Sequence, residues 1–350
     1  MADLPGLRVI WRVGRTRLLR FAVAVFFLGA WLQVIVMMRP DLARPTDIGT
    51  DTSNYYAAGQ RLADGHALYA LSPGDRPVPQ DSPPFFSVPL LSPPPIAVIW
   101  RFLAILPDSV AMYAWWIIAV LVSTTLAAFL IWRTNALPLA VAAPLFLGLA
   151  ITIWSGNVNA LLLPITALVW PATSGGLPTA RWAPLAGLAV ALATAVKLSP
   201  VLLLWWFATS GQWRAAKWAV LLGALLFAGT LVIAGPDSFA AYLDVTRATS
   251  TVGPTGLSVT KLLERAGVVH SIAVLAPVAV TILVGILCIV FRKRPAAGFA
   301  VTAVGIVFAS PVVRFESLSQ AIVAVAPWVD WRLPSCIRHP APAKFTPWKP

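Results

Sequence analysis

Acidic residues and histidines are the first candidates for acid–base chemistry because they are scarce: the 350-residue chain has 13 Asp and Glu and three His. Six of the aspartates lie between residues 39 and 85, and one of them, Asp51, opens a segment with helical spacing of Tyr55, Ala58 and Leu62. At the start of a short amphipathic helix, Asp51 could act as a cap and dipole partner. It could equally remove a proton from a hydroxyl group. The spacing alone leaves both interpretations open.

Lys197 is a single charged residue within an apolar stretch. It is followed by Leu-Ser-Pro, which ends at Pro200. A charged side chain inside a bilayer is energetically unfavourable and usually has a function there. Pro200 interrupts helical hydrogen bonding three residues later and leaves carbonyl groups available. An ammonium group in such a place favours a phosphate partner. Snorkelling of the side chain to the membrane interface is the alternative interpretation.

Two more groups of polar residues interrupt apolar runs. Between Ser155 and Asn159, a glycine permits a tight turn, and the amides of Asn157 and Asn159 could satisfy backbone groups or bind sugar hydroxyls. Near the end of the chain, Arg314 and Glu316 could form an ion pair where a span ends outside. A plain turn and a purely structural ion pair are the alternatives. The two cysteines fit neither a disulfide framework nor a metal site.

The elements that must position these side chains are membrane helices, because 59% of the residues are hydrophobic and 11% are charged. A soluble domain carries nearer a quarter charged residues, and a membrane helix needs roughly 20 apolar residues. We therefore predict an all-α polytopic membrane protein of about ten spans. A re-entrant or interfacial helix is the alternative for the second, proline-preceded run. The apolar runs are 21–38, 86–106, 112–132, 137–154, 158–172, 183–208, 215–234, 270–291, 296–313 and 318–331.

Basic residues gather between these runs, so the net charge of +13 indicates membrane topology more than nucleic-acid binding. Arginines before the first run place the N-terminus in the cytoplasm. Alternation then places Arg214, Lys217 and residues 292–294 on the same side, and the long loops 39–85 and 236–267 outside. The predicted division is a cytoplasmic N-terminus at 1–20, a transmembrane domain at 21–331 and a basic, proline-rich cytoplasmic tail at 332–350.

Five short motifs, in order over residues of about 45 to 328, resemble those of glycosyltransferase family 87. They are Asp51 with Tyr55, Ala57-Ala58, Gly65 and Tyr69; the prolines at 93–95; Gly156 to Asn159; Lys197 to Pro200; and Ser310-Pro311. The resemblance implies a GT-C-like bundle, with short amphipathic helices in the first outer loop, that uses a polyprenyl-phosphate sugar as donor. Known members are α-mannosyltransferases and arabinofuranosyltransferases of bacterial envelope lipoglycans.

The resemblance also implies roles for particular residues. Asp51 is expected to be the general base, and Lys197 or Arg314 to hold the phosphate. The sugar is expected to be mannose, transferred in α-linkage to an envelope glycolipid or polysaccharide at the outer face of the cell membrane. No metal or other cofactor is expected, since fixed cations can stabilise the departing phosphate. The residues expected to bind substrate are Tyr55, Tyr56, His66, Asn157, Asn159, Lys197, Arg314 and Glu316.

Two other functions fit parts of the pattern. A transporter or flippase of a lipid-linked or polar solute would also explain Lys197 and the proline-broken helices. It predicts repeat symmetry and a midplane site, whereas six aspartates in the first loop favour a transferase. A catalytically altered, truncated relative is the third interpretation. It is suggested by Arg314 and Glu316, where an aromatic or histidine-bearing stretch is expected, and by a chain shorter than expected.

Overall fold

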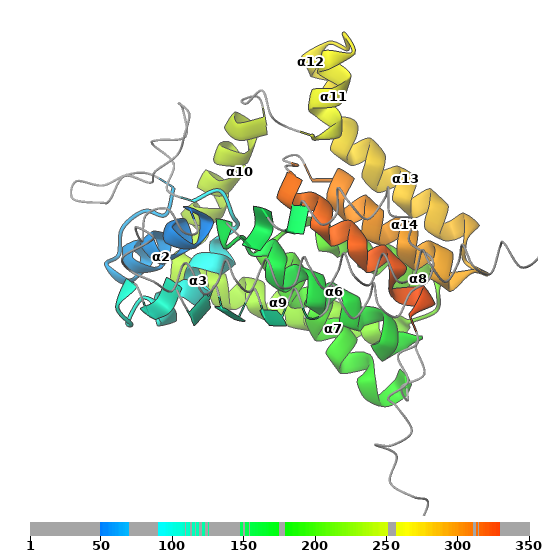
Figure 1. Cartoon of the computed structure of the whole chain (residues 1–350), viewed down its shortest axis with the longest axis horizontal. Coiled ribbons are helices and arrows are strands. Elements are labelled where there is room, and N and C mark those ends of the chain that lie inside the picture. Colours follow the sequence, from blue (N-terminus) through cyan, green and yellow to red (C-terminus); the bar gives the residue numbers. More distant parts are fainter. Residues whose placement is uncertain are drawn as a thin grey trace, which may run out of the picture.

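The computed structural model describes residues 50–69, 90–108, parts of 110–125, 148–174, 179–250, 257–310 and 313–329, with single residues omitted within some ranges. Every regular element in these ranges is a helix, which confirms the all-α prediction for this part of the chain (Figure 1). The predicted first span at 21–38, the N-terminus at 1–20 and the tail at 332–350 lie outside the described residues.

The helices follow the predicted apolar runs in part, and they divide the runs 183–208 and 270–291 into shorter segments. The predicted run 183–208 is broken after Val196, and a new helical segment begins at Ser199 with Pro200 in its first turn, as the proline predicts. In chain order the helices are α2 (Thr50–Ala63), α3 (Pro94–Leu103), α6 (Asn159–Thr173), α7 (Thr179–Val196), η3 (Ser199–Leu202), α8 (Leu203–Thr209), α9 (Trp213–Ala234), α10 (Pro236–Ser250), α11 (Val259–Arg265), α12 (His270–Ala273), α13 (Ala276–Val290), α14 (Pro295–Phe308) and η4 (Phe315–Trp328).

Within the residues that the structure describes, two stretches are long and apolar enough to cross a membrane by length and composition, α9 and the segment from His270 to Val290 that contains α12 and α13. Both expose large apolar side chains, among them Leu225 on α9 and Ile282 on α13. In water such faces would be unfavourable, whereas in a bilayer they contact lipid. The other apolar helices are shorter, so about ten spans stays a prediction.

In the part of the chain that the structure describes, two clusters of buried side chains hold the helices together. The larger cluster contains Trp206 and Phe299, whose ring centroids lie 5.0 Å apart, and joins α6, α7, α8, α13, α14 and η4. The smaller cluster surrounds Trp100 and joins α2 and α3 to the start of α6, the middle of α10 and the ends of α7 and α9. Tyr55 and Leu62 occupy the buried face of α2, which confirms the amphipathic helix predicted after Asp51.

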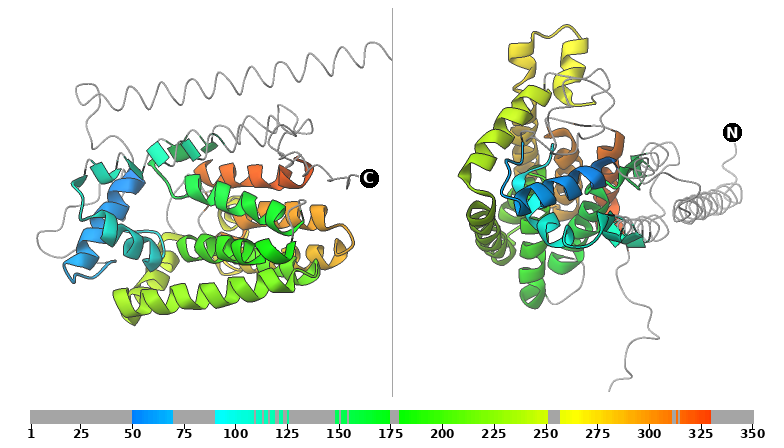
Figure 2. Two further views of the ribbon diagram at one scale, coloured as in Figure 1. Left: turned by 90° about the horizontal axis from the view of Figure 1, so that it is seen from below. Right: turned by 90° about the vertical axis from the view of Figure 1, so that its left-hand side faces the viewer.

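Basic residues gather at one end of the bundle. At one end, the Trp206 indole donates a hydrogen bond of 2.9 Å to the Pro295 carbonyl, which brings Arg214 and residues 292–294 to the same end. From there α9 extends for about 33 Å, and Ala234 at its other end packs against the cluster around Trp100. Consequently α2 lies at the end of α9 remote from these basic residues (Figure 2).

The crossing of α2 and α3 depends on Gly59. A Cβ atom at this position would lie 2.5 Å from the Trp100 carbonyl carbon, a backbone atom that cannot rotate away. We expect Gly59→Ala to reduce the free energy of unfolding by about 1–3 kcal/mol, the usual effect of overpacking. The melting temperature of the detergent-solubilised protein measures this effect.

Gly223 provides the matched control, because it lies within helix α9 and a Cβ atom there would meet nothing within 4 Å. Gly223→Ala should leave the melting temperature unchanged or raise it, since alanine has the better helix propensity. Equal effects of the two substitutions would show that α2 and α3 do not cross as closely as described.

Candidate active site

Asp51 lies in the first turn of α2 and faces the turn before α6. Its Oδ2 accepts a hydrogen bond of 2.8 Å from the Asn157 side-chain amide. The neighbouring Thr52 hydroxyl and the Trp115 indole donate to the Gly156 carbonyl at 3.1 and 3.2 Å. Gly156 has a φ of 62°, a conformation that side chains other than glycine rarely adopt. The turn predicted at this glycine therefore exists, and it presents Asn157 to the carboxylate.

The orientation of the Asn157 amide follows from its second hydrogen bond. The Asn159 backbone N–H donates to Asn157 Oδ1 at 2.9 Å. Because only the carbonyl oxygen of an amide accepts hydrogen bonds, the Asn157 NH₂ group must be the atom facing Asp51. Asn157 is thus a donor that orients the carboxylate.

Asn159, the first residue of α6, links this turn to Lys197. The Asn159 side chain is buried, and its Oδ1 accepts a hydrogen bond of 3.2 Å from the Lys197 ammonium group. Lys197 follows the last residue of α7, where the helix breaks before Ser199. A second donor, Gln320 Nε2 on η4, reaches the same oxygen at 2.6 Å. Three elements that are distant in sequence therefore converge on one amide.

Sequence reasoning missed Gln320. It lies in the run 318–331, which the sequence predicts to be an apolar span, and it is 4% exposed. A polar amide inside a predicted span is a signal that could have identified it, by the same argument that singles out Lys197.

The predicted aromatic residues divide between two environments. The Tyr55 hydroxyl accepts a hydrogen bond of 3.4 Å from the Val158 backbone N–H, so Tyr55 touches the same turn as Asp51. The Tyr56 hydroxyl instead donates to the Leu106 carbonyl at 3.0 Å. Both rings pack near Trp100 in the smaller cluster, with centroids 6.2 and 6.4 Å from it. Stacking of a sugar on either ring stays a prediction.

Of the three remaining predicted substrate-binding residues, the structure describes the side chain of His66 alone. His66 follows the C-terminal end of α2 and is exposed, about 20 Å along the helix axis from Asp51. Arg314 and the side chain of Glu316 lie outside the described part of the chain. The roles of all three stay predictions.

Several motifs that are separate in sequence touch one another. The turn from Gly156 to Asn159 contacts both Asp51 and Lys197. The Tyr69 hydroxyl donates a hydrogen bond of 2.7 Å to the Ser92 carbonyl, which joins the end of the first motif to the proline-rich run. Burial raises the pKa of Tyr69, so this phenol stays a neutral donor at physiological pH.

The family model of glycosyltransferase family 87 matches residues 91–313 of the chain. The chain belongs to glycosyltransferase family 87. Membership confirms the resemblance stated from the motifs, and the family consists of membrane glycosyltransferases. The matched range contains Asn157, Asn159 and Lys197, whereas Asp51 and Gln320 lie outside it. No curated protein and no solved structure matches the chain.

The converging side chains offer a carboxylate, two amides and an ammonium group to a ligand. Hydrogen bonds connect them in the order Asp51, Asn157, Asn159 and Lys197, with one backbone N–H in the middle. Within the described ranges, no group of three or more His, Cys, Asp and Glu side chains is placed to hold a metal ion. That catalysis uses no metal stays a prediction.

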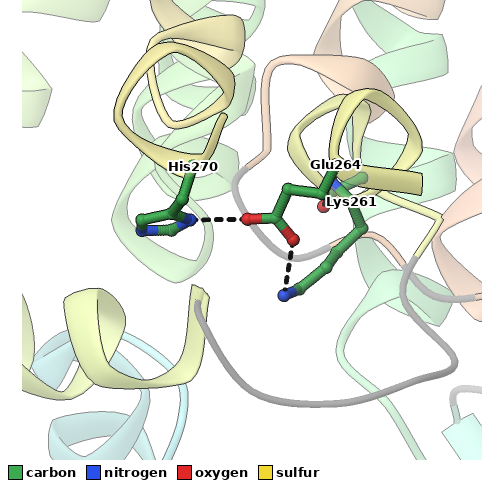
Figure 3. A network of polar contacts seen from close by, with 4 residues as sticks. Lys261, Glu264 and His270 are labelled. Atoms are coloured by element: carbon green, nitrogen blue, oxygen red, sulfur yellow. Dashed lines mark hydrogen bonds and ion pairs between the residues drawn. The ribbon is translucent and has the colours of Figure 1, made fainter. Parts of the chain in front are cut away.

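A second polar cluster lies on α11 and α12, within and beside the long loop predicted at 236–267. Glu264 Oε2 accepts a hydrogen bond of 2.8 Å from the Lys261 ammonium group, and Glu264 Oε1 forms a hydrogen bond of 2.5 Å with His270 Nδ1 (Figure 3). These two partners, Lys261 first, hold the pKa of Glu264 below its usual value of 4.5. Glu264 therefore ties α11 to the start of α12 while it is ionised.

The lowered pKa of Glu264 predicts a local acid sensitivity. A group with a depressed folded pKa stabilises the fold above its usual pKa, and this contribution is lost as the pH falls through the folded value. We expect the amides of α11 and α12 to exchange hydrogen faster, relative to their intrinsic rates, as the pH falls below 4.5. In Glu264→Gln the same amides should already exchange faster at neutral pH and change less on acidification. Identical profiles for the two proteins would contradict this role.

Proposed function

We propose that the protein transfers mannose, in α-linkage, from a polyprenyl-phosphate donor to an envelope glycolipid or polysaccharide at the outer face of the cell membrane. The observation that carries the proposal is the hydrogen-bonded series from Asp51 through Asn157 and Asn159 to Lys197. This series joins a carboxylate and an ammonium group, which supports the roles of base and phosphate-binding cation. Transfer from a lipid phosphate requires both groups.

The chemistry follows from the donor. The acceptor hydroxyl oxygen attacks the anomeric carbon of the sugar, and the bond from that carbon to the phosphate oxygen breaks with its electron pair going to the phosphate. Asp51 takes the proton that the hydroxyl loses. Lys197 stabilises the negative charge on the departing polyprenyl phosphate. Asn157 holds the Asp51 carboxylate in position, which limits the rearrangement needed to reach the transition state.

The charge distribution supports an outer location for this reaction. The basic residues Arg214 and Lys217 lie at the start of α9, and cytoplasmic ends of membrane helices are enriched in such residues. The opposite end of α9 packs against the cluster around Trp100, to which α2 contributes Tyr55 and Leu62. We therefore propose a multi-pass protein of about ten spans with both termini in the cytoplasm and Asp51 outside.

Exposed apolar side chains support a path for the polyprenyl chain along α3 and α7. Phe102 and Ile105 lie on and just after α3, and Leu188 and Leu198 lie on and just after α7. A lipid chain lying here would run beside the break that carries Lys197. The proposed groove lies between these two helices, which correspond to the second and sixth apolar runs.

A transfer assay tests the proposed function. Membranes containing the protein are incubated with polyprenyl-phosphate mannose labelled in the sugar and with an extracted envelope glycolipid. The expected result is label in the glycolipid and release of an equal amount of polyprenyl phosphate. Polyprenyl-phosphate arabinofuranose in a parallel reaction tests the choice of sugar. Movement of intact donor across vesicle bilayers without labelled glycolipid would indicate a flippase instead.

A further inference from the structure

Gln320 is a buried polar residue that the proposed mechanism does not use. It lies on η4, which packs against α6 and α14, and it is 4% exposed. Its Nε2 donates to Asn159 Oδ1 at 2.6 Å, whereas its Oε1 is buried without a hydrogen-bond partner. Gln320 thus presents an unsatisfied acceptor beside the residue that holds Lys197.

The assignment of these amide atoms follows from Lys197. An ammonium group only donates, so the Asn159 atom that faces it at 3.2 Å must be the carbonyl oxygen. Gln320 meets this same oxygen and must therefore face it with its NH₂ group. The atom without a hydrogen-bond partner is therefore the Gln320 carbonyl oxygen, Oε1. Rotating the Gln320 amide by 180° would instead place two carbonyl oxygens against each other.

A buried carbonyl without a partner is unfavourable, and such groups are uncommon unless a ligand or an ordered water completes them. Two buried hydroxyl oxygens, those of Thr194 and Ser199, also have no hydrogen-bond partner, and they lie within three residues of Lys197 along the chain. Hydroxyl groups and an ammonium suit the acceptor oxygens of a phosphate. The Gln320 carbonyl needs a donor, which an ionised phosphate does not provide and a sugar hydroxyl does.

We propose that Gln320 binds a hydroxyl group of the donor sugar through Oε1 and so contributes to sugar specificity. The inference rests on the proposed function, because it takes the ligand to be a sugar on a lipid phosphate. Asn159 holds both Gln320 and Lys197 through one oxygen atom. The sugar contact and the phosphate contact are therefore set at a fixed spacing by a single side chain.

Removing the sugar hydroxyl and removing the Gln320 amide should weaken binding of the donor by the same amount, without a further loss when both are removed. A double-mutant cycle tests this expectation. The variant is Gln320→Met, which keeps the length of the side chain without its polar atoms. The ligands are polyprenyl-phosphate mannose, its four monodeoxy analogues and polyprenyl phosphate without sugar. Ligand-induced shifts of the melting temperature in detergent give the affinities, and the transfer assay gives KM and kcat.

The wild type should bind one deoxy analogue about tenfold more weakly than the mannose donor. Gln320→Met should bind those two ligands equally, and it should raise KM for the mannose donor more than it lowers kcat. Its response to polyprenyl phosphate without sugar should not change. Gln320→Asn, which withdraws the amide by one methylene, should show the same loss of discrimination and replaces Gln320→Met if that variant does not fold.

Gln212→Met is the matched control, because Gln212 donates to the Thr173 carbonyl at the opposite end of α6 from Asn159. It should discriminate the deoxy analogues as the wild type does. If Gln320 had a purely structural role, Gln320→Met would instead lower the melting temperature without ligand and weaken the binding of all ligands alike. That result would overturn the inference. So would a wild type that binds every deoxy analogue as tightly as mannose. If neither lipid shifts the wild-type melting temperature, the proposed donor itself is wrong, and the inference fails with it.

Discussion

Replacing Asp51 by Asn should lower kcat for sugar transfer by about 10²- to 10⁴-fold, the usual contribution of a general base. Asparagine keeps the size of the side chain and an oxygen that accepts the hydrogen bond from the Asn157 amide. It cannot take the proton of the acceptor hydroxyl at physiological pH. The expected signature is therefore a large loss of kcat, with little change in the KM of the donor and in the melting temperature.

Asp64→Asn is the control for this experiment. Asp64 follows α2 directly and is exposed, so the same change of charge is made on the same segment without touching the turn at Asn157. It should retain wild-type transfer. Transfer by Asp51→Asn at more than a tenth of the wild-type rate would exclude Asp51 as the general base and would leave it the role of a dipole partner in the first turn of α2.

The residues of the site were visible in the sequence one at a time. Asp51 stands out because acidic residues are scarce and it opens an amphipathic segment, whereas Asn157, Asn159 and Lys197 stand out because they interrupt apolar runs. For each residue, however, a structural interpretation remained open. The contacts among the four residues favour the functional interpretation over the structural one. These contacts join positions up to 106 residues apart. Periodicity within single segments carries no information on such contacts.

The fold shows the same division between local and distant information. The helix after Asp51 and the break before Pro200 follow from spacing and from proline chemistry within a few residues. The position of Gln320 opposite Asn159 depends on how η4 packs against α6. A search that counts only charges in apolar runs overlooks it, because an amide raises the polarity of a window much less than a lysine does.

Lys197→Met should lower kcat/KM for the polyprenyl-phosphate donor by about 10²- to 10³-fold, as removal of one group that stabilises transition-state charge usually does. The variant should still fold. Methionine occupies a similar volume, and Asn159 Oδ1 keeps the hydrogen bond from Gln320 when the ammonium group is gone. The loss should appear both in kcat and in the affinity for polyprenyl phosphate without sugar, since the phosphate is present in donor and product alike.

Lys217→Met separates this effect from a general loss of positive charge. Lys217 is exposed near the start of α9, at the end of the bundle remote from α2, and its removal should leave transfer unchanged. Arginine at position 197 provides a further comparison, because it keeps the charge but spreads it over a planar group with different geometry. If Lys197→Met transfers sugar within threefold of the wild type, the departing phosphate must be stabilised by another cation, with Arg314 the first candidate.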